Sequence, residues 1–433
     1  SENIGGLSNY FSRIWASKTY KGIKKSGASV LKPLPQAYHL ARKVETQMKA
    51  MVAPGTIFEE LGFNYVGPID GHNIKEMIDV ISNLKDFDGP QFLHVITKKG
   101  AGLDPAESDR IGFHAIGKIK SIKSDSSPKL KYQDIFSDWI VDMAEKDESL
   151  VAITPAMREG SGLVDFSKKY PDRYFDVAIA EQHSVTFAAG LSLENKKPVV
   201  AIYSTFLQRA YDQFIHDVAV QNLDVTFALD RAGLVGEDGP THSGNYDIAY
   251  LRCIPNIILM TPSDENETRL LLTTAFKHKG PAAVRYPRGT GPNASVNSDL
   301  EGAGIGKARV IRESNSNVVF LNFGALLDKA LEVSEKMDFT LIDMRFVKPL
   351  DHEILKKYLS KADYFLSLED GSIAGGAGSA VQEFCSIESI DIKSILFGIP
   401  DRFIEHSSRE EMLESAGLSV AKILDRLKSL LEK

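Results

Sequence analysis

The feature that most constrains the fold is a series of short, uninterrupted apolar runs, each followed by a helix-like segment. Residues 198–203 (PVVAIY) and 225–230 (VTFALD) show no regular alternation of polar and apolar side chains. A strand that is apolar on both faces is buried on both faces, which is typical of a parallel sheet covered by helices. The middle of the chain is therefore predicted to form an α/β domain around a parallel sheet.

Three successive strand-to-helix transitions lie between Tyr174 and His242, and each carries polar or aromatic side chains. In open α/β sheets, ligands bind at the carboxyl ends of the strands. The candidate site residues are, in chain order, Glu181, Tyr203, Phe206, Arg209, Arg231, Asp238 and His242. A structural reading stays open for Glu181, because a helix dipole stabilises an acid in the first turn by roughly 0.3–1 kcal/mol.

Four motifs give this arrangement a family resemblance: AIAEQH (178–183), YSTFLQRAYDQ (203–213), DRAGLVGEDGPTHSG (230–244) and RYPRG (285–289). Together they resemble the pyrimidine-binding domain of thiamine-diphosphate enzymes and, more narrowly, the 1-deoxy-D-xylulose-5-phosphate synthase family. The resemblance covers essentially the whole chain. It implies an α/β protein of three transketolase-like parallel-sheet domains, of which the first is incomplete.

The expected domain boundaries follow from the motifs and from local composition. Residues 1–116 are expected to be the C-terminal remnant of a diphosphate-binding domain, and the Lys/Ser-rich segment 117–131 is expected to be a linker. Residues 132–292 are the expected pyrimidine-binding domain. Residues 306–433 are the expected transketolase C-terminal-like domain, in which strand-like and helix-like segments alternate.

The resemblance also implies an activity. It implies a transferase of the transketolase class that decarboxylates pyruvate and joins the remaining two-carbon unit to D-glyceraldehyde 3-phosphate. The products are CO2 and 1-deoxy-D-xylulose 5-phosphate, a precursor of isoprenoids, thiamine and pyridoxal. Thiamine diphosphate and Mg²⁺ are the implied cofactors, and a homodimer is the implied assembly.

The same resemblance assigns roles to individual side chains. Glu181 is expected to bond N1′ of the aminopyrimidine ring, where a poorly solvated carboxyl group can share its proton. Phe206 is expected to hold the ring face, with Tyr203 and Arg209 beside it. The remaining expected roles are catalysis for His242, Asp238 and His114, cofactor binding for Lys99, and binding of the acceptor phosphate for Tyr203, Arg231 and Arg288.

One family element is absent from the sequence, namely the Gly-Asp-Gly and Asn-containing turn that hold the diphosphate and its magnesium. In the resembling family this magnesium motif lies upstream of the position that Ser1 occupies here, so no metal ligand is assigned in this chain. We therefore expect a truncated or split form of the enzyme. Alone, this form is expected to be inactive and to bind thiamine diphosphate poorly, whereas an associated N-terminal fragment would restore magnesium and cofactor binding. The first domain of this chain is expected to leave an open sheet edge and an exposed apolar face.

Composition narrows the function classes. A net charge of −7 argues against general nucleic-acid binding, and there is no run of eighteen apolar residues with which to span a membrane. The first residues lack the basic and apolar regions of a signal peptide. Cys253 and Cys385 lie far apart and are interpreted as reduced packing residues, consistent with a cytoplasmic protein.

Three segments look functional but are interpreted as structural. Asp70-Gly71-His72 fits a turn that caps the following helix. The Gly-rich run from Ser372 to Gly378 lacks the first half of the dinucleotide-binding spacing and is assigned no nucleotide. Residues 8–26 form a basic amphipathic stretch, which we interpret as a solvated face over an apolar seam rather than as a surface-binding helix.

Alternative functions stay open at this point. A transketolase or the β-subunit of a 2-oxoacid dehydrogenase would share the pyrimidine-domain motifs. The β-subunit, however, is not expected to carry FEELGFNYVGPIDGHN (58–73) and TKKGAG (97–102) ahead of them. An inactive scaffold is the non-enzyme alternative, because fold does not fix function. The intact set of Glu181, Tyr203, Arg231, His242 and Arg288 argues against it.

Overall fold

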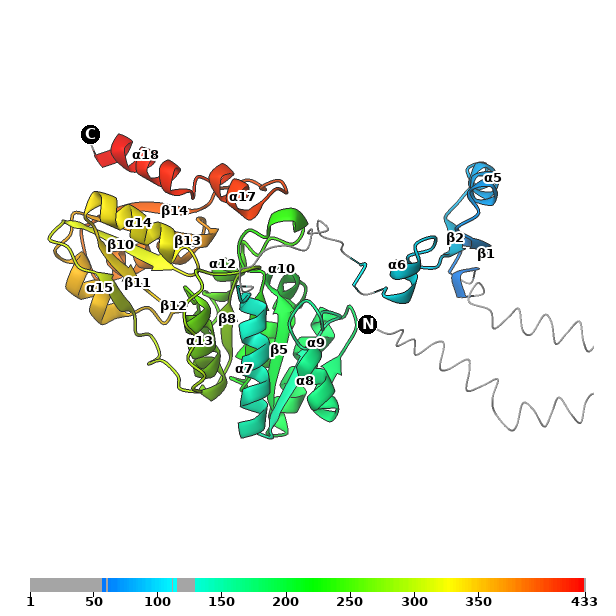
Figure 1. The fold of residues 1–433 in the computed structure, drawn as a ribbon, viewed down its shortest axis with the longest axis horizontal. Coiled ribbons are helices and arrows are strands. Elements are labelled where there is room, and N and C mark those ends of the chain that lie inside the picture. The colour runs from blue at the N-terminus through cyan, green and yellow to red at the C-terminus, as the bar shows by residue number, and fades with distance from the viewer. Residues whose placement is uncertain (1–56, 60, 111, 115–128, 432–433) are drawn as a thin grey trace, which may run out of the picture. The chain divides into compact units, whose positions relative to one another are not determined.

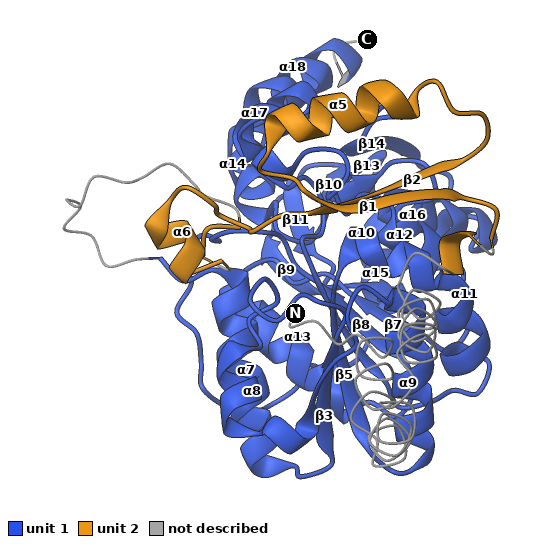
Figure 2. Cartoon of the chain, turned by 90° about the vertical axis from the view of Figure 1, so that its right-hand side faces the viewer, with its two compact units in different colours: residues 1–2, 127–433 blue, residues 3–126 orange. Residues whose placement is uncertain are grey.

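The computed structural model describes residues 57–59, 61–110, 112–114 and 129–431. It divides into two compact units, one of residues 3–126 and one of residues 127–433 with residues 1–2 (Figures 1 and 2). Ser1, the amphipathic stretch 8–26 and most of the predicted linker 117–131 lie outside the described residues. The expectation that the magnesium motif lies upstream of Ser1 therefore stays a prediction, as do the domain boundaries.

The larger unit contains a seven-stranded sheet in the order β12-β7-β8-β6-β5-β3-β4. Its strands are β3 (Leu150–Thr154), β4 (Tyr174–Asp176), β5 (Lys197–Tyr203), β6 (Thr226–Asp230), β7 (Ile258–Met260), β8 (Ala282–Arg285) and β12 (Phe346–Lys348). All neighbouring pairs are parallel except β12 and β7. The predicted parallel sheet is thus confirmed. One edge strand, β12, was not predicted: it comes from the C-terminal part of the chain and pairs antiparallel with β7.

Burial on both faces explains the uninterrupted apolar runs. Within β5, Val199 and Ala201 pack into one hydrophobic core, and Val200 and Ile202 pack into another on the opposite face. The first core is formed with α7 (Tyr132–Lys146) and α13 (Glu265–Lys277). The second is formed with helices that include α9 (Glu181–Leu193) and α12 (Asp247–Leu251). With both faces covered by helices, the carboxyl ends of the strands are where a ligand site is expected.

The C-terminal part of this unit forms a five-stranded sheet in the order β14-β13-β10-β11-β9, parallel except for β9. Its strands are β9 (Arg309–Arg312), β10 (Val318–Phe323), β11 (Thr340–Asp343), β13 (Tyr364–Ser372) and β14 (Lys393–Ile399). Its helices are α14 (Leu327–Met337), α15 (His352–Leu359), α16 (Ala377–Ile387), α17 (Arg409–Ser415) and α18 (Val420–Leu431). This alternation of strands and helices matches the predicted third α/β domain.

A buried ion-pair network joins the two sheets. Arg285, at the end of β8, is almost fully buried and pairs with Asp247 at 2.8 Å and with Asp370 of β13. On the other side, Arg309 of β9 pairs with Asp343 at 2.9 Å and donates to Ser263 at 2.8 Å. Removing one partner of such a buried pair leaves an uncompensated charge, so these contacts fix how the two sheets dock.

The smaller unit contains a parallel pair of strands, β1 (Asn64–Asp70) and β2 (Gln91–Ile96), with α5 (Ile74–Leu84) and α6 (Asp104–Ser108). Three isoleucines on α5 are exposed, Ile74 by 71%, Ile78 by 58% and Ile81 by 50%. Their spacing places them on one side of the helix. These exposed isoleucines agree with the predicted apolar face of the first domain, which stays a prediction because much of that domain lies outside the described residues.

The Asp70-Gly71-His72 segment is a turn, as predicted. The Asp70 carboxylate accepts a hydrogen bond from the backbone N–H of His72 at 2.9 Å, and Asn73 caps α5 by accepting from the N–H of Glu76 at 3.2 Å. The His72 ring accepts from the N–H of Lys98 at 2.7 Å. All three side chains therefore serve local structure. Across the described ranges, no helix has both the length and the apolar character needed to cross a membrane.

Candidate functional site

Glu181 is the first residue of α9, and a second carboxylate shapes the turn that delivers it. Asp176, at the end of β4, accepts hydrogen bonds from the backbone N–H groups of Ala156 at 3.0 Å and Ala178 at 2.9 Å. Ala178 has a φ of 59°, which ends the strand. The mostly apolar run 175–179 predicts a strand of that extent, but β4 ends at Asp176 because the left-handed Ala178 breaks it.

The Glu181 carboxylate is buried, with only 4% of the residue exposed. Its Oε1 accepts a hydrogen bond from Arg209 Nη1 at 2.9 Å. Its Oε2 forms no hydrogen bond with any other described residue. One acceptor atom of a buried carboxylate thus stays available at the carboxyl edge of the sheet.

Aromatic rings form a shelf beside this carboxylate. Tyr203, at the end of β5, and Phe206, in α10 (Ser204–Leu207), stack with ring centroids 5.7 Å apart. The edge of the His242 ring meets Phe206 at 5.4 Å, and the Arg209 guanidinium lies 5.5 Å from the Phe206 centroid. Arg209 therefore links the shelf to Glu181, and these predicted site residues share one contact network.

Arg231 extends the same network beyond Tyr203. Its guanidinium lies 3.8 Å from the centroid of the Tyr203 ring. Its Nη1 donates to the Gly160 carbonyl at 3.0 Å and to Asp230 Oδ2 at 2.8 Å. Its Nε is buried and has no partner among the described residues, and its Nη2 makes no hydrogen bond within the described part of the chain.

Arg288 contacts the loop that carries Asp238. Its Nη1 donates to the Val235 carbonyl at 2.8 Å and to Glu237 at 3.0 Å, and lies 3.4 Å from Asp238 Oδ2. Burial raises the pKa of Tyr203 to about 12, while the positive charges of Arg231 and Arg288 act in the opposite direction. Both arginines are therefore within electrostatic reach of the Tyr203 hydroxyl.

His242 closes the Gly-rich loop that begins after Arg231. Its Nδ1 is hydrogen-bonded to the Thr241 hydroxyl at 2.9 Å, and its backbone N–H donates to the Gly239 carbonyl at 3.2 Å. These bonds fix the ring against Phe206 and leave Nε2 without a hydrogen bond among the described residues. The second ring nitrogen can therefore accept or donate a proton.

Lys99 and His114 belong to the smaller unit, where Lys99 Nζ lies 2.7 Å from His114 Nδ1. Both side chains are exposed. Lys99 and His114 thus contact each other within the smaller unit, whereas the Glu181 network lies in the larger unit.

Sequence reasoning missed two residues that shape the site. Asp230 is 1% exposed and bonds directly to Arg231. Gly160 lies so close to Tyr203 that a Cβ at this position would be 1.8 Å from the tyrosine hydroxyl. Asp230 could have been found, because it is the only acid in the buried run 225–230. Gly160 had no comparable signal, because the contact joins segments more than forty residues apart.

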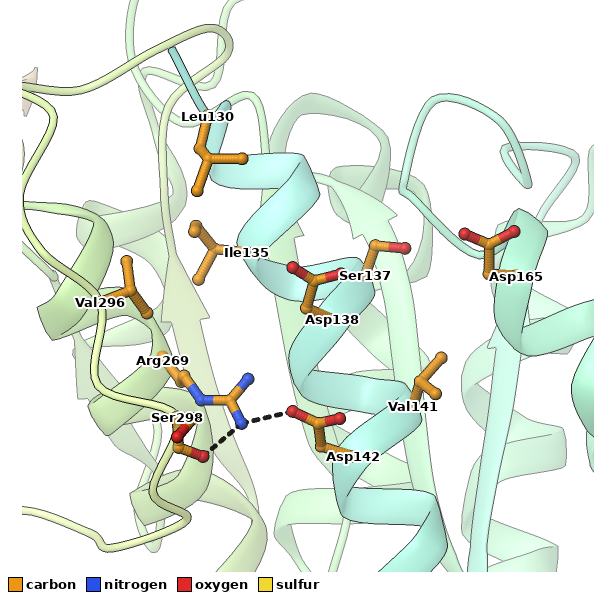
Figure 3. A pocket seen from close by; sticks show the side chains of 10 residues that line it. All are labelled: Leu130, Ile135, Ser137, Asp138, Val141, Asp142, Asp165, Arg269, Val296 and Ser298. Atoms are coloured by element: carbon orange, nitrogen blue, oxygen red, sulfur yellow. Dashed lines mark hydrogen bonds and ion pairs between the residues drawn. The ribbon is translucent and has the colours of Figure 1, made fainter. Parts of the chain in front are cut away.

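A cavity of about 360 Å³ lies elsewhere, along α7 and next to Arg269 of α13 (Figure 3). Arg269 is 4% exposed and donates to Asp142 at 2.6 Å and to the Ser298 carbonyl at 2.7 Å (Figure 3). None of the predicted site residues lines this cavity. The arginine there cross-links α7, α13 and the segment that follows β8, which is a structural role.

Comparisons with known proteins define the class first. Residues 128–293 match the family described as transketolase, pyrimidine binding domain, and residues 306–423 match transketolase, C-terminal domain. A solved structure titled "Split gene transketolase, inactive beta4 tetramer" aligns with a TM-score of 0.62 at 27% identity, covering 70% of this chain and 99% of that one. The protein is thus transketolase-like.

The particular family follows from two further findings. Residues 1–97 match the family described as 1-deoxy-D-xylulose-5-phosphate synthase. The synthase of Hahella chejuensis is 55% identical over 439 aligned residues, covering all of this chain and 68% of the relative. That of Stutzerimonas stutzeri is 56% identical, covering 98% of this chain and 67% of the relative. The chain belongs to the 1-deoxy-D-xylulose-5-phosphate synthase family, and it spans about two thirds of these relatives.

Proposed function

We propose that the Glu181 network binds the aminopyrimidine ring of thiamine diphosphate and the phosphate of D-glyceraldehyde 3-phosphate during synthesis of 1-deoxy-D-xylulose 5-phosphate from pyruvate. The observation that carries this proposal is the continuous contact path from Glu181 through Arg209, Phe206 and Tyr203 to Arg231. It joins a buried carboxylate to an arginine of which one edge has no partner among the described residues.

The residues fit an aminopyrimidine. A flat, weakly polar ring needs an aromatic surface and one acceptor or proton-sharing group at its edge. Phe206 supplies the surface, and the free Oε2 of Glu181 supplies the edge contact. When bound, thiamine diphosphate would supply the carbon nucleophile, and Glu181 would hold the edge of its aminopyrimidine ring and share a proton with it. Among the described residues, no three His, Cys, Asp or Glu side chains gather to hold a metal ion.

The acceptor phosphate is assigned to Arg231 and Arg288, with the Tyr203 hydroxyl beside them. Two N–H groups on one edge of a guanidinium suit two phosphate oxygens, and the Nε and Nη2 atoms of Arg231 are unpaired within the described chain. Arg288 is half-exposed and already shares its Nη1 with Glu237 and Asp238. A phosphate would compete with the exposed Glu237 and the partly buried Asp238 for this guanidinium, which makes Arg288 the more easily rearranged of the two arginines.

His242 and Asp238 are assigned to the substrate carboxylate and to proton transfer. The Nε2 atom of His242 is open, and Phe206 holds the ring at the edge of the shelf. Asp238 lies on the loop that Arg288 contacts. A phosphate that binds Arg288 would therefore change the contact between Arg288 and Asp238, and with it the position of Asp238. Lys99 is assigned to cofactor binding and His114 to catalysis on the family resemblance alone.

The test compares Arg231→Gln and Arg288→Gln with wild type in product formation from both substrates. A charged hydrogen bond contributes about 1.5–3 kcal/mol, so the half-saturating concentration of D-glyceraldehyde 3-phosphate should rise about tenfold to a hundredfold. The value for pyruvate should not change. Calorimetry with the aldehyde phosphate gives the same comparison where turnover is absent.

Arg402→Gln is the matched control, since Arg402 is exposed and its side chain bonds only to Ser415 in the described chain. An equal loss for both substrates would mean that Arg231 and Arg288 are structural. A non-phosphorylated aldehyde should be nearly insensitive to either substitution.

We also propose that the chain forms a homodimer through the exposed side of α9. Leu193 on α9 is 59% exposed, and Val220, at the end of the adjoining helical segment Phe214–Ala219, is 71% exposed. Gly190 lies on the same helix as Leu193, and a Cβ there would meet nothing within 4 Å. An apolar side that the described side chains leave uncovered favours a second copy as its partner.

A further inference from the structure

The carboxylate of Asp230, at the end of β6, bonds twice to the residue that follows it. Its Oδ1 accepts a hydrogen bond from the backbone N–H of Arg231 at 2.6 Å, and its Oδ2 accepts one from Arg231 Nη1 at 2.8 Å. Only 1% of Asp230 is exposed. One buried carboxylate therefore fixes both the backbone and the side chain of Arg231.

The backbone of Arg231 needs this support. Its φ of 60° lies in the left-handed region, which strains a residue with a side chain. The turn carries the guanidinium back over Tyr203, where Nη1 uses its second hydrogen on the Gly160 carbonyl. Both hydrogens of Nη1 are thus engaged, and the guanidinium can rotate little.

The edge opposite this anchor is the one that stays unpaired within the described chain. Nε is buried without a partner there, and a buried donor of this kind calls for an acceptor. We propose that Asp230 is a positioning residue, which holds Nη1 so that the Nε–Nη2 edge of Arg231 faces the phosphate of the acceptor substrate. This inference rests on the proposed function and adds to it a residue that does not touch the substrate.

Asp230 has two opposite effects on a bound anion. Its charge repels a phosphate, so loss of the charge alone would tighten binding. Its two oxygens orient Arg231, whereas asparagine has one acceptor oxygen for two N–H donors and would leave one of them unpaired. Because a two-point contact depends on the orientation of the guanidinium, we expect the loss of orientation to outweigh the loss of repulsion.

Protonation should have the same effect as the asparagine, because it turns one acceptor oxygen into a donor. Burial raises the pKa of Asp230 to about 6, although the charges of Arg231 and Arg288 act to lower it. The other titratable neighbours are the hydroxyls of Tyr203 and Tyr286, and burial raises the pKa of each. The anchor on Nη1 is therefore expected to weaken on the acid side of about pH 6.

The test uses the 433-residue chain and inorganic sulfate, whose charge does not change in the pH range used. Binding is followed by NMR of the arginine Nε groups, with the Arg231 signal identified by its loss in Arg231→Gln. In Asp230→Asn, sulfate should bind about tenfold more weakly, the loss expected for one charge-assisted hydrogen bond. The control Asp224→Asn, which removes the same charge before the start of β6, should bind as wild type does.

Each outcome decides between the roles. Unchanged or tighter binding in Asp230→Asn overturns the positioning role. Unchanged binding in Arg231→Gln, or no binding by wild type, overturns the proposed phosphate site and the inference with it.

If Asp230→Asn does not fold, wild type alone decides. Its sulfate affinity should fall as the pH is lowered from about one unit above the pKa of Asp230 to about one unit below it, whereas protonation of a histidine or simple loss of negative charge would raise it. A constant or rising affinity refutes the positioning role.

Discussion

Replacing Glu369 with glutamine is predicted to remove one contribution to the pH dependence of folding stability. Glu369 lies in β13 and is 1% exposed. Its carboxylate accepts hydrogen bonds from the backbone N–H groups of Ala377 at 2.8 Å and Gly378 at 2.9 Å, at the start of α16. These bonds favour the charged form, but burial outweighs them and raises the pKa of Glu369 to about 7.

The size of the effect follows from that change. The pKa rises from 4.5 to about 7, and one pKa unit corresponds to about 1.4 kcal/mol, so the contribution is about 3 kcal/mol. Because the folded pKa lies above the unfolded one, this stability is fully present below about pH 4.5 and is lost as the pH rises through about 7. Glutamine stays neutral at every pH, so the Glu369→Gln variant does not lose this stability as the pH rises.

The assay is urea unfolding of wild type and Glu369→Gln at about pH 5 and about pH 8. The free energy of unfolding of the variant relative to wild type should increase with pH by up to about 3 kcal/mol. Glu410→Gln, which changes an exposed glutamate of α17, is the control and should show little change. A variant that becomes less stable relative to wild type at high pH would show that the two N–H bonds outweigh burial, and would refute the reasoning.

Three further predictions concern the site and the assembly. In an active form that includes the family's diphosphate-binding motif, Glu181→Gln should keep the fold and slow turnover roughly 10²–10⁴-fold, the usual effect of losing a positioned proton-transfer group; wild-type turnover would contradict the assignment. Calorimetry of the 433-residue chain should show poor binding of thiamine diphosphate, because the sequence lacks the family's diphosphate-binding turn; tight, magnesium-dependent binding without a second polypeptide would contradict this. Gly190→Trp should lower the mass measured by light scattering from dimer to monomer; an unchanged dimer would place the interface elsewhere.

Much of the fold could be predicted because both faces of the sheets are buried. A short, continuous apolar run such as 198–203 is typical of a strand that is buried on both faces of a parallel sheet. The sequence did not reveal β12, because so short a strand carries no period and pairs with β7, which lies far earlier in the chain. It also overextended β4, because a left-handed alanine at position 178 has no sequence signal.

The site was predictable to the extent that its side chains follow strands directly. Tyr203 and Arg231 follow this rule, and they stack in the structure. The Glu237 and Asp238 contacts of Arg288 were not predictable, because they depend on how a Gly-rich loop folds back. The Gly-rich run 372–378 was interpreted as structural, and the structure agrees. The backbone N–H groups of Ala377 and Gly378 donate hydrogen bonds to the carboxyl group of Glu369 in the same chain.

The proposed site binds the aminopyrimidine ring and the acceptor phosphate with residues at the ends of different strands. Mutations should therefore affect the two binding functions separately. Glu181 follows β4 at the sheet edge, whereas Arg231 follows β6 near the centre. Within the described chain, the stacked pair of Tyr203 and Phe206, at the end of β5 and the start of α10, connects the two. A change in Arg231 can reach Glu181 through this network only by disturbing that stack. A loss confined to the phosphate-bearing substrate would therefore mean that the stack stays intact, while a loss that includes cofactor activation would mean that Arg231 also supports the aromatic shelf.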